Sequence, residues 1–134
     1  MKNEIQKHSI NNIVKKTLSG KSELKEYKPF QKDIFLFDTY IAGTTHIENI
    51  DELEKEINID NRLEFFRQEE NTNDTNAIEI RNSKNIKIGY VPKVDNIIFS
   101  RLMDAGKLLY AIVTNKEYYG KWVKIYIDIY LSEL

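Results

Sequence analysis

The C-terminal stretch Trp122–Leu131 most constrains the fold, because its side chains alternate between apolar and polar. Its apolar positions are Ile125, Ile127, Ile129 and Leu131, and the residues between them are Lys124, Tyr126, Asp128 and Tyr130. A repeat of two residues predicts a β-strand that buries one face and exposes the other. This stretch therefore indicates a fold made mainly of β-structure.

Shorter runs rich in β-branched and aromatic residues predict further strands at 34–43, 63–67, 77–81, 86–91 and 108–114. A tight turn at 83–85 joins two of them into a hairpin, and residues 115–121 predict a longer turn. Helical spacing relates Ile50, Leu53 and Ile57. A second helix is predicted after Pro92, with one apolar face made of Val94, Ile98, Leu102 and Ala105. Together these elements predict a small, partly open, OB-like β-barrel with two or three helices.

The first 33 residues differ from this pattern. Between residues 4 and 18, apolar side chains recur at helical spacing, and Gly20 follows where a helix would stop: Ile5, Ile10, Ile13, Val14 and Leu18. Residues 21–32 are polar and include Pro29, which is typical of a linker. The sequence thus predicts an amphipathic helical arm and linker over 1–33, and one barrel domain over 34–134.

Composition excludes several classes of protein. The chain has no cysteine, so it has no disulfides and no thiolate metal site, and its two histidines, His8 and His46, lie far apart in sequence. No run approaches the ~20 apolar residues that span a bilayer. We therefore expect a soluble cytoplasmic protein with no membrane association, no bound metal and no cofactor.

Catalytic motifs are missing as well. The sequence has neither a Gly-x-Ser-x-Gly elbow nor a Gly-Lys-Ser/Thr phosphate loop. The acids Glu69, Glu70 and Asp74 could coordinate a cation, but clustered acids in a loop are usually solvated. We expect a binding domain with no catalytic residues rather than an enzyme.

Charge is unevenly distributed although the formal net charge is only -1. Residues 1–33 carry eight lysines and four acids, residues 47–79 carry eleven acids and three basic residues, and residues 80–134 carry nine basic residues and five acids. An anionic ligand is therefore steered to the C-terminal half or to the arm. Scattered surface charge that serves only solubility is the alternative.

The polar loop after the second predicted strand carries the most specific pattern. Its residues, with a corner that follows about ten residues later, are Arg67, Asn71, Asp74, Asn76, Ala77 and Ile78, then Gly89, Tyr90, Val91 and Pro92. Together with "FDTYIAGTTH" and "SRLMDAGK", this order resembles the HIRAN domain, a module found fused to DNA translocases and ubiquitin ligases and also alone in bacteria. The resemblance spans about residues 34–131.

This resemblance implies an OB-like barrel that binds the free 3′ end of single-stranded DNA in a pocket beside the loop. Asp74 would accept a hydrogen bond from the terminal hydroxyl and repel an additional phosphate. Tyr90 would lie near the end pocket, with Lys93 meeting phosphate. Asn73 and Asn76 would shape the pocket. DNA-binding members carry an Arg-aromatic-aromatic run that corresponds to Thr45, His46 and Ile47 here, so His46 is the ring left to stack at this place.

A second group of candidates precedes the last strand. Tyr118, Tyr119, Lys121 and Trp122 combine rings with positive charge, a composition suited to stacking bases and neutralising phosphates. We include Lys121 and Trp122 among the DNA-contacting residues. A tryptophan half-buried at the barrel rim is the alternative.

Structural roles compete with ligand contact at several positions. Asp74 and Asn76 are common turn formers, whose side chains bond nearby backbone amides. Arg67 and Asn71 are expected to brace the loop, with Arg67 in an ion pair among Glu69, Glu70 and Asp74. Gly43 and Gly89 are expected to meet a backbone requirement and so shape the site without contacting the ligand.

The favoured interpretation is a non-catalytic DNA-binding module that recognises single-stranded DNA, including its 3′ end, in repair or replication-fork processing. A DNA helicase, a nuclease or another repair protein would then be a partner. The alternative is a protein-interaction module that keeps the barrel but has lost strong DNA binding, and a small enzyme acting on nucleic-acid ends is a third interpretation. The oligomeric state is left open.

Overall fold

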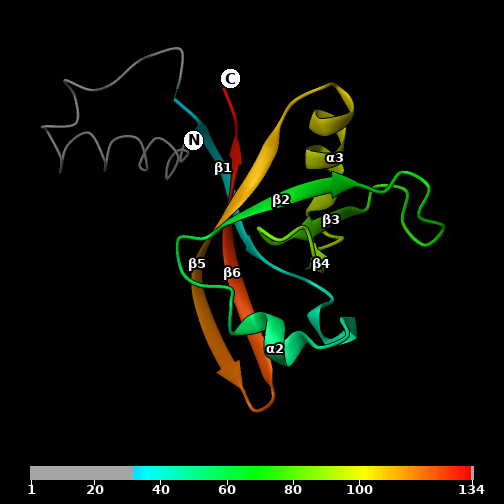
Figure 1. Ribbon diagram of the computed structural model, residues 1–134. Coiled ribbons are helices and arrows are strands. Elements are labelled where there is room, and N and C mark those ends of the chain that lie inside the picture. The colour runs from blue at the N-terminus through cyan, green and yellow to red at the C-terminus, as the bar shows by residue number, and fades with distance from the viewer. Residues whose placement is uncertain (1–31, 134) are drawn as a thin grey trace, which may run out of the picture.

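The computed structural model describes residues 32–133, whose six strands form a single curled sheet (Figure 1). In chain order the elements are β1 (Ile34–Tyr40), the 3₁₀ helix η3 (Thr44–His46), α2 (Ile50–Glu54), β2 (Arg62–Arg67), β3 (Ile78–Arg81), β4 (Lys87–Tyr90), α3 (Asn96–Asp104), β5 (Leu109–Tyr119) and β6 (Trp122–Leu131). The strand order in the sheet is β1-β6-β5-β2-β3-β4. The predicted arm at residues 4–18 and most of its linker lie outside the described residues.

β6 follows the alternation that its sequence predicted. Ile125, Ile127 and Ile129 are buried, whereas Lys124 and Tyr126 keep partial exposure. The strand pairs antiparallel with β1 on one edge and with β5 on the other. β6 is therefore a central strand of the sheet, and its buried face contributes directly to the core.

The predicted turn over 115–121 is wrong. β5 continues to Tyr119 and pairs with β6 as far as Tyr119↔Trp122, so the turn consists of Gly120 and Lys121. Gly120 has a φ of 65°, the left-handed conformation that a two-residue hairpin turn needs and that glycine adopts readily. Cross-strand pairing along β6 keeps this polar segment extended.

The sheet closes on itself between the end of β1 and β4. The Ala42 N–H donates to the Tyr90 carbonyl oxygen (2.8 Å), and the Tyr90 N–H donates to the Ala42 carbonyl oxygen (2.9 Å). A Cβ on Gly89 would lie 2.5 Å from the Ile41 Cγ2 atom and 2.6 Å from the Ala42 oxygen, so this approach requires glycine. Within residues 32–133, this bridge is the only pairing between the two edge strands, and the predicted partly open OB-like barrel is confirmed.

The core fills the inside of this curl. Most of its members are aliphatic residues from every strand except β1: Leu63, Ile78, Ile80, Ile88, Ala111, Val113, Ile125, Ile127 and Ile129. Ile41 and Ile57 add to it from the segments after β1 and α2. Burial of these side chains supplies the main favourable free energy of folding.

The predicted face of α3 is wrong for Val94, Ile98 and Ala105, which are exposed, whereas Leu102 does pack against the core. Val94 lies in the turn before the helix, which begins at Asn96, and Val94 and Ile98 point into solvent. The inward face instead carries Asn96, Phe99 and Ser100. Phe99, Leu102 and Met103 supply the apolar contact, while Asn96 and Ser100 make hydrogen bonds that an apolar face could not make. Within the described residues, no helix is long and apolar enough to cross a membrane.

Candidate functional site

The loop that joins β2 to β3 is ordered by its own asparagine and aspartate side chains. The Asn71 Oδ1 atom accepts hydrogen bonds from the backbone N–H groups of Asn73 (2.8 Å) and Asp74 (3.1 Å). The Asp74 Oδ1 atom accepts one from the N–H of Asn76 (2.9 Å). These bonds replace the strand pairing that the loop lacks, so the polar composition has a direct structural cause.

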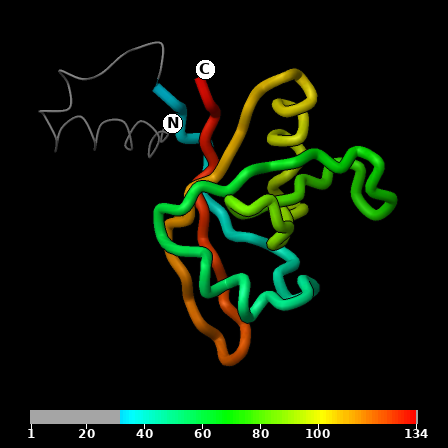
Figure 2. The backbone as a smooth tube through the Cα atoms, in the orientation of Figure 1, coloured from blue at the N-terminus to red at the C-terminus, as the bar shows by residue number. Residues whose placement is uncertain are grey.

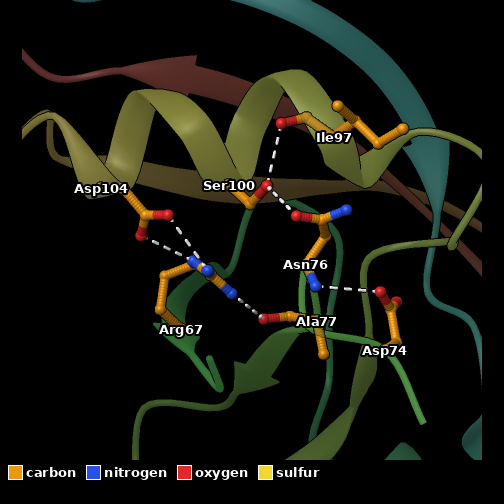
Figure 3. Close-up of polar contacts among 7 residues, drawn as sticks. All are labelled: Arg67, Asp74, Asn76, Ala77, Ile97, Ser100 and Asp104. Atoms are coloured by element: carbon orange, nitrogen blue, oxygen red, sulfur yellow. Dashed lines mark hydrogen bonds and ion pairs between the residues drawn. The ribbon is translucent and has the colours of Figure 1, made fainter. Parts of the chain in front are cut away.

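Helix α3 holds the far side of this loop (Figure 3). The Asn96 amide donates to the Asp74 Oδ2 atom (2.8 Å), and the Ser100 hydroxyl lies 3.4 Å from the Asn76 Oδ1 atom. Each carboxylate oxygen of Asp74 thus accepts one hydrogen bond. A carboxylate offers about four acceptor positions, so roughly two stay available on this half-buried side chain.

Arg67 makes its ion pair with the same helix. Its Nε and Nη2 atoms donate to the two oxygens of Asp104 (2.8 and 3.1 Å), and Nη1 donates to the Ala77 carbonyl oxygen (2.9 Å) (Figure 3). The hydrogen bond with Asp104 raises the pKa of Arg67 and lowers the pKa of Asp104 below its ordinary value. Arg67 was expected to pair with an acid of its own loop, and this prediction is wrong because its ion pair is with Asp104. Glu69 and Asp74 add only a weaker electrostatic attraction.

Tyr90 is connected to the loop through Gln68. The Tyr90 hydroxyl donates to the Gln68 Oε1 atom (2.9 Å), which also accepts from the Asn71 amide (3.1 Å). The Gln68 amide in turn donates to the buried Glu79 carboxylate. Tyr90 and the loop of Asp74 therefore lie on one side of the molecule and share a hydrogen-bond network.

The segment after β1 approaches Tyr90 from the other direction. Gly43 has a φ of 74°, and a Cβ there would lie 3.8 Å from the Tyr90 Cδ1 atom. Thr45 and His46 follow on η3, and both are exposed. Lys93 is exposed after the Tyr-Val-Pro corner, and Lys87 holds its Nζ atom 4.5 Å from the centre of the Tyr90 ring.

The hairpin candidates lie elsewhere. Lys121 and Trp122 are at the end of the β5–β6 hairpin, at the bottom of the view in Figure 2, whereas the 68–77 loop projects to the right. Trp122 packs against Tyr119, with ring centres 5.4 Å apart. A small pocket of about 30 Å³ connects the hairpin to η3, with a lining that includes Thr45, Lys121 and Trp122. Asp74 therefore lies near Tyr90, whereas Thr45 lies near the hairpin. The candidates do not form a single concave site.

An open hollow of about 440 Å³ lies against the first half of the loop. It is lined by Arg67, Gln68, Glu69, Glu70 and Asn71. Across residues 32–133, no group of three or more His, Asp or Glu side chains is arranged to hold a metal ion.

Sequence reasoning missed the residues that position the loop. They are Gln68, Glu79, Asn96, Ser100 and Asp104. One signal was available, because Asn96, Ser100 and Asp104 recur every four residues and so share a helix face. The apolar residues of α3 predicted a different inward face, so the spacing of these polar residues was not used.

The fold and site define a small OB-like barrel that carries a hydrogen-bonded polar loop beside its closure, an architecture typical of ligand-binding modules. The HIRAN domain family matches residues 34–133, and the chain belongs to this family. The family assignment made from the loop and the Tyr-Val-Pro corner is thereby confirmed.

Two solved structures share this fold. A crystal structure of a protein from Lactobacillus plantarum is 22% identical, with a TM-score of 0.70, over 75% of this chain and 96% of that one. The crystal structure of the HIRAN domain of human HLTF is 14% identical, with a TM-score of 0.58, over 74% of this chain and 78% of that one. A comparison with curated proteins gives no match.

Proposed function

We propose that this HIRAN domain binds single-stranded DNA and holds its free 3′ end against Asp74. HIRAN domains are known generally as nucleic-acid-binding modules, and membership of the family supports the proposal. The observation that carries it is the orientation of the Asp74 carboxylate, which is held by the Asn76 N–H and the Asn96 amide. A carboxylate held in this way accepts a hydrogen bond from a hydroxyl without reorganisation and repels a terminal phosphate.

The neighbouring residues suit the rest of such a strand. Tyr90 and His46 would stack bases, Asn73 and Thr45 would line the path, and Lys93 would neutralise phosphate. Stacking of a base on an aromatic ring contributes about 1–3 kcal/mol. Lys121 and Trp122 would contact nucleotides further from the end, since the hairpin is separated from the loop. In the cell this activity would serve DNA repair or replication-fork processing, beside a helicase or nuclease.

The test compares two fluorescent oligonucleotides of one sequence, one with a 3′ hydroxyl and one with a 3′ phosphate, by anisotropy. We expect tighter binding of the hydroxyl form, and Asp74→Asn should reduce the preference because the neutral amide no longer repels phosphate. Affinity should fall with salt, as phosphate contacts require. Equal affinity for both ends would refute end recognition, and binding that ignores salt would refute phosphate contact.

A second function, recognition of a protein segment, is favoured by a different observation. The hollow beside the loop exposes Glu69 and Glu70, and the exposed Thr45 and His46 stand where DNA-binding members carry arginine and an aromatic residue. An acidic hollow suits a basic peptide better than a phosphate chain. In that case no oligonucleotide would bind at moderate salt, while a lysine-rich peptide would bind and lose affinity in a double substitution Glu69→Gln and Glu70→Gln.

A further inference from the structure

The outer surface of α3 presents an apolar patch that neither proposed function uses. Val94, Ile97 and Ile98 have exposed fractions of 87%, 50% and 67%, and Phe37 of β1 beside them is 39% exposed. These four residues, which we call the α3 patch, border an open hollow of about 410 Å³ that also touches Asp95 and Phe99. Contiguous apolar side chains of this kind mark places where another surface binds.

We propose that the α3 patch is the docking site of the chain's own N-terminal segment, residues 4–18. The apolar residues of this segment include Ile10, Ile13, Val14 and Leu18, whose spacing forms one stripe on a helix. A helix of this length extends about 22 Å, enough to cover α3, which is about 13 Å long. An apolar stripe laid into an apolar groove is a common mode of helix recognition.

The position of the segment along the chain makes this contact accessible. β1 begins at Ile34, three residues before Phe37, and Phe37 packs against Phe99 of α3 at a ring distance of 5.8 Å. The residues between Leu18 and Ile34 can extend up to about 50 Å, so the segment reaches the patch with length to spare. A tethered segment acts at an effective concentration of the order of millimolar, so a modest apolar contact suffices.

The size of the patch favours this occupant over a second copy of the chain. A stable interface between two proteins buries about 800 Å² on each partner. Four partly exposed side chains supply much less than that. The opposite side of α3 holds Asp74 and Arg67 through Asn96 and Asp104, so docking would also steady the helix that positions the loop.

The natural absence of cysteine allows a direct test in the full chain. In the variant Ile13→Cys with Ile98→Cys, a short bis-maleimide should join the two sites within one molecule, on the order of tenfold faster than in a control pair. The control keeps Ile13→Cys and places the second thiol at Asn58→Cys, an exposed position after α2. Mass spectrometry distinguishes an internal cross-link from a dimer.

Each outcome decides the proposal. Faster internal linking of the first pair supports it, and equal rates for the two pairs overturn it. Cross-linked dimers whose yield rises with protein concentration would assign the patch to a second copy instead. A further variant, Val94→Lys with Ile97→Lys, changes only exposed side chains and should abolish the difference between the two pairs; an unchanged difference would also overturn the proposal.

Discussion

At the scale of single residues, Asn96 has the most unusual environment in residues 32–133. It is 1% exposed, its amide donates to Asp74, and its Oδ1 atom is the one buried side-chain polar atom of the described region without a hydrogen-bond partner. Leaving a buried acceptor unsatisfied costs about 1–3 kcal/mol. The fixed orientation of Asp74 is therefore maintained at some expense of stability.

The substitution Asn96→Asp tests this environment. It places a second carboxylate against Asp74 in a buried position, so the free energy of unfolding at neutral pH should fall by roughly 3 kcal/mol. Repulsion raises the pKa of such a pair, so the loss should shrink as the pH falls through that raised value and one carboxyl becomes a donor. Urea unfolding at neutral and mildly acidic pH measures both effects.

Asn96→Ala is the matched control, because it removes the same hydrogen bond without adding charge. Its loss of stability should be smaller and nearly independent of pH over the same range. A loss in Asn96→Asp that did not change with pH would contradict the contact between the two side chains.

At the scale of elements, the β5–β6 hairpin extends past the barrel and is joined across its strands by Glu117. This carboxylate accepts hydrogen bonds from the hydroxyls of Tyr119 and Tyr126, which lowers the pKa of Glu117. The same contact with Glu117 raises the pKa of Tyr119 to about 12 and also raises the pKa of Tyr126. The polar segment that looked like a loop is thus held as a strand by side chains that meet only after pairing.

Replacement of Glu117 by glutamine should lower the pKa of Tyr119 toward its ordinary value of about 10. Because the pKa of Tyr119 is raised in the folded state, its hydrogen bond to Glu117 stabilises the fold fully below about pH 10. This contribution to the free energy of unfolding is lost as the pH rises toward about 12. Titration of labelled tyrosine rings by NMR in the wild-type and Glu117→Gln chains measures the shift. Lys124, which faces the same cluster, can be replaced by methionine as a control that leaves the hydrogen bonds in place.

At the scale of the whole molecule, closure between the end of β1 and β4 brings the site together. Gly89 passes so close to Ile41 and Ala42 that no side chain fits, and the bridge at Tyr90 places its ring beside Gly43. Pairing of β3 with β4 places the Tyr-Val-Pro corner next to the polar loop, and the closure adds the 3₁₀ helix on the other side of Tyr90.

Gly89→Ala should therefore destabilise the domain by about 3 kcal/mol or more, because its Cβ overlaps a backbone oxygen that cannot move away. Gly120→Ala is the matched control: its φ is also positive, but no atom lies within 4 Å of the added carbon. That control should cost only about 1 kcal/mol. Similar midpoints of urea unfolding for the two variants would contradict the close approach at Gly89.

The amino-acid sequence by itself determined most of the strands, the barrel class and the family. Alternation in β6 and the order of the Asn-rich loop and Tyr-Val-Pro corner are local patterns, and a period of two specifies a strand wherever one face is buried.

Only the tertiary structure decided which face of α3 turns inward, that Arg67 pairs with Asp104 and that β5 reaches Tyr119. It also decided that the end of the β5–β6 hairpin lies apart from the 68–77 loop (Figure 2). Each of these depends on a partner tens of residues away or on strand pairing. Such partners meet only when the barrel closes, because a residue's local pattern specifies its backbone conformation but not which distant side chain completes its hydrogen bonds.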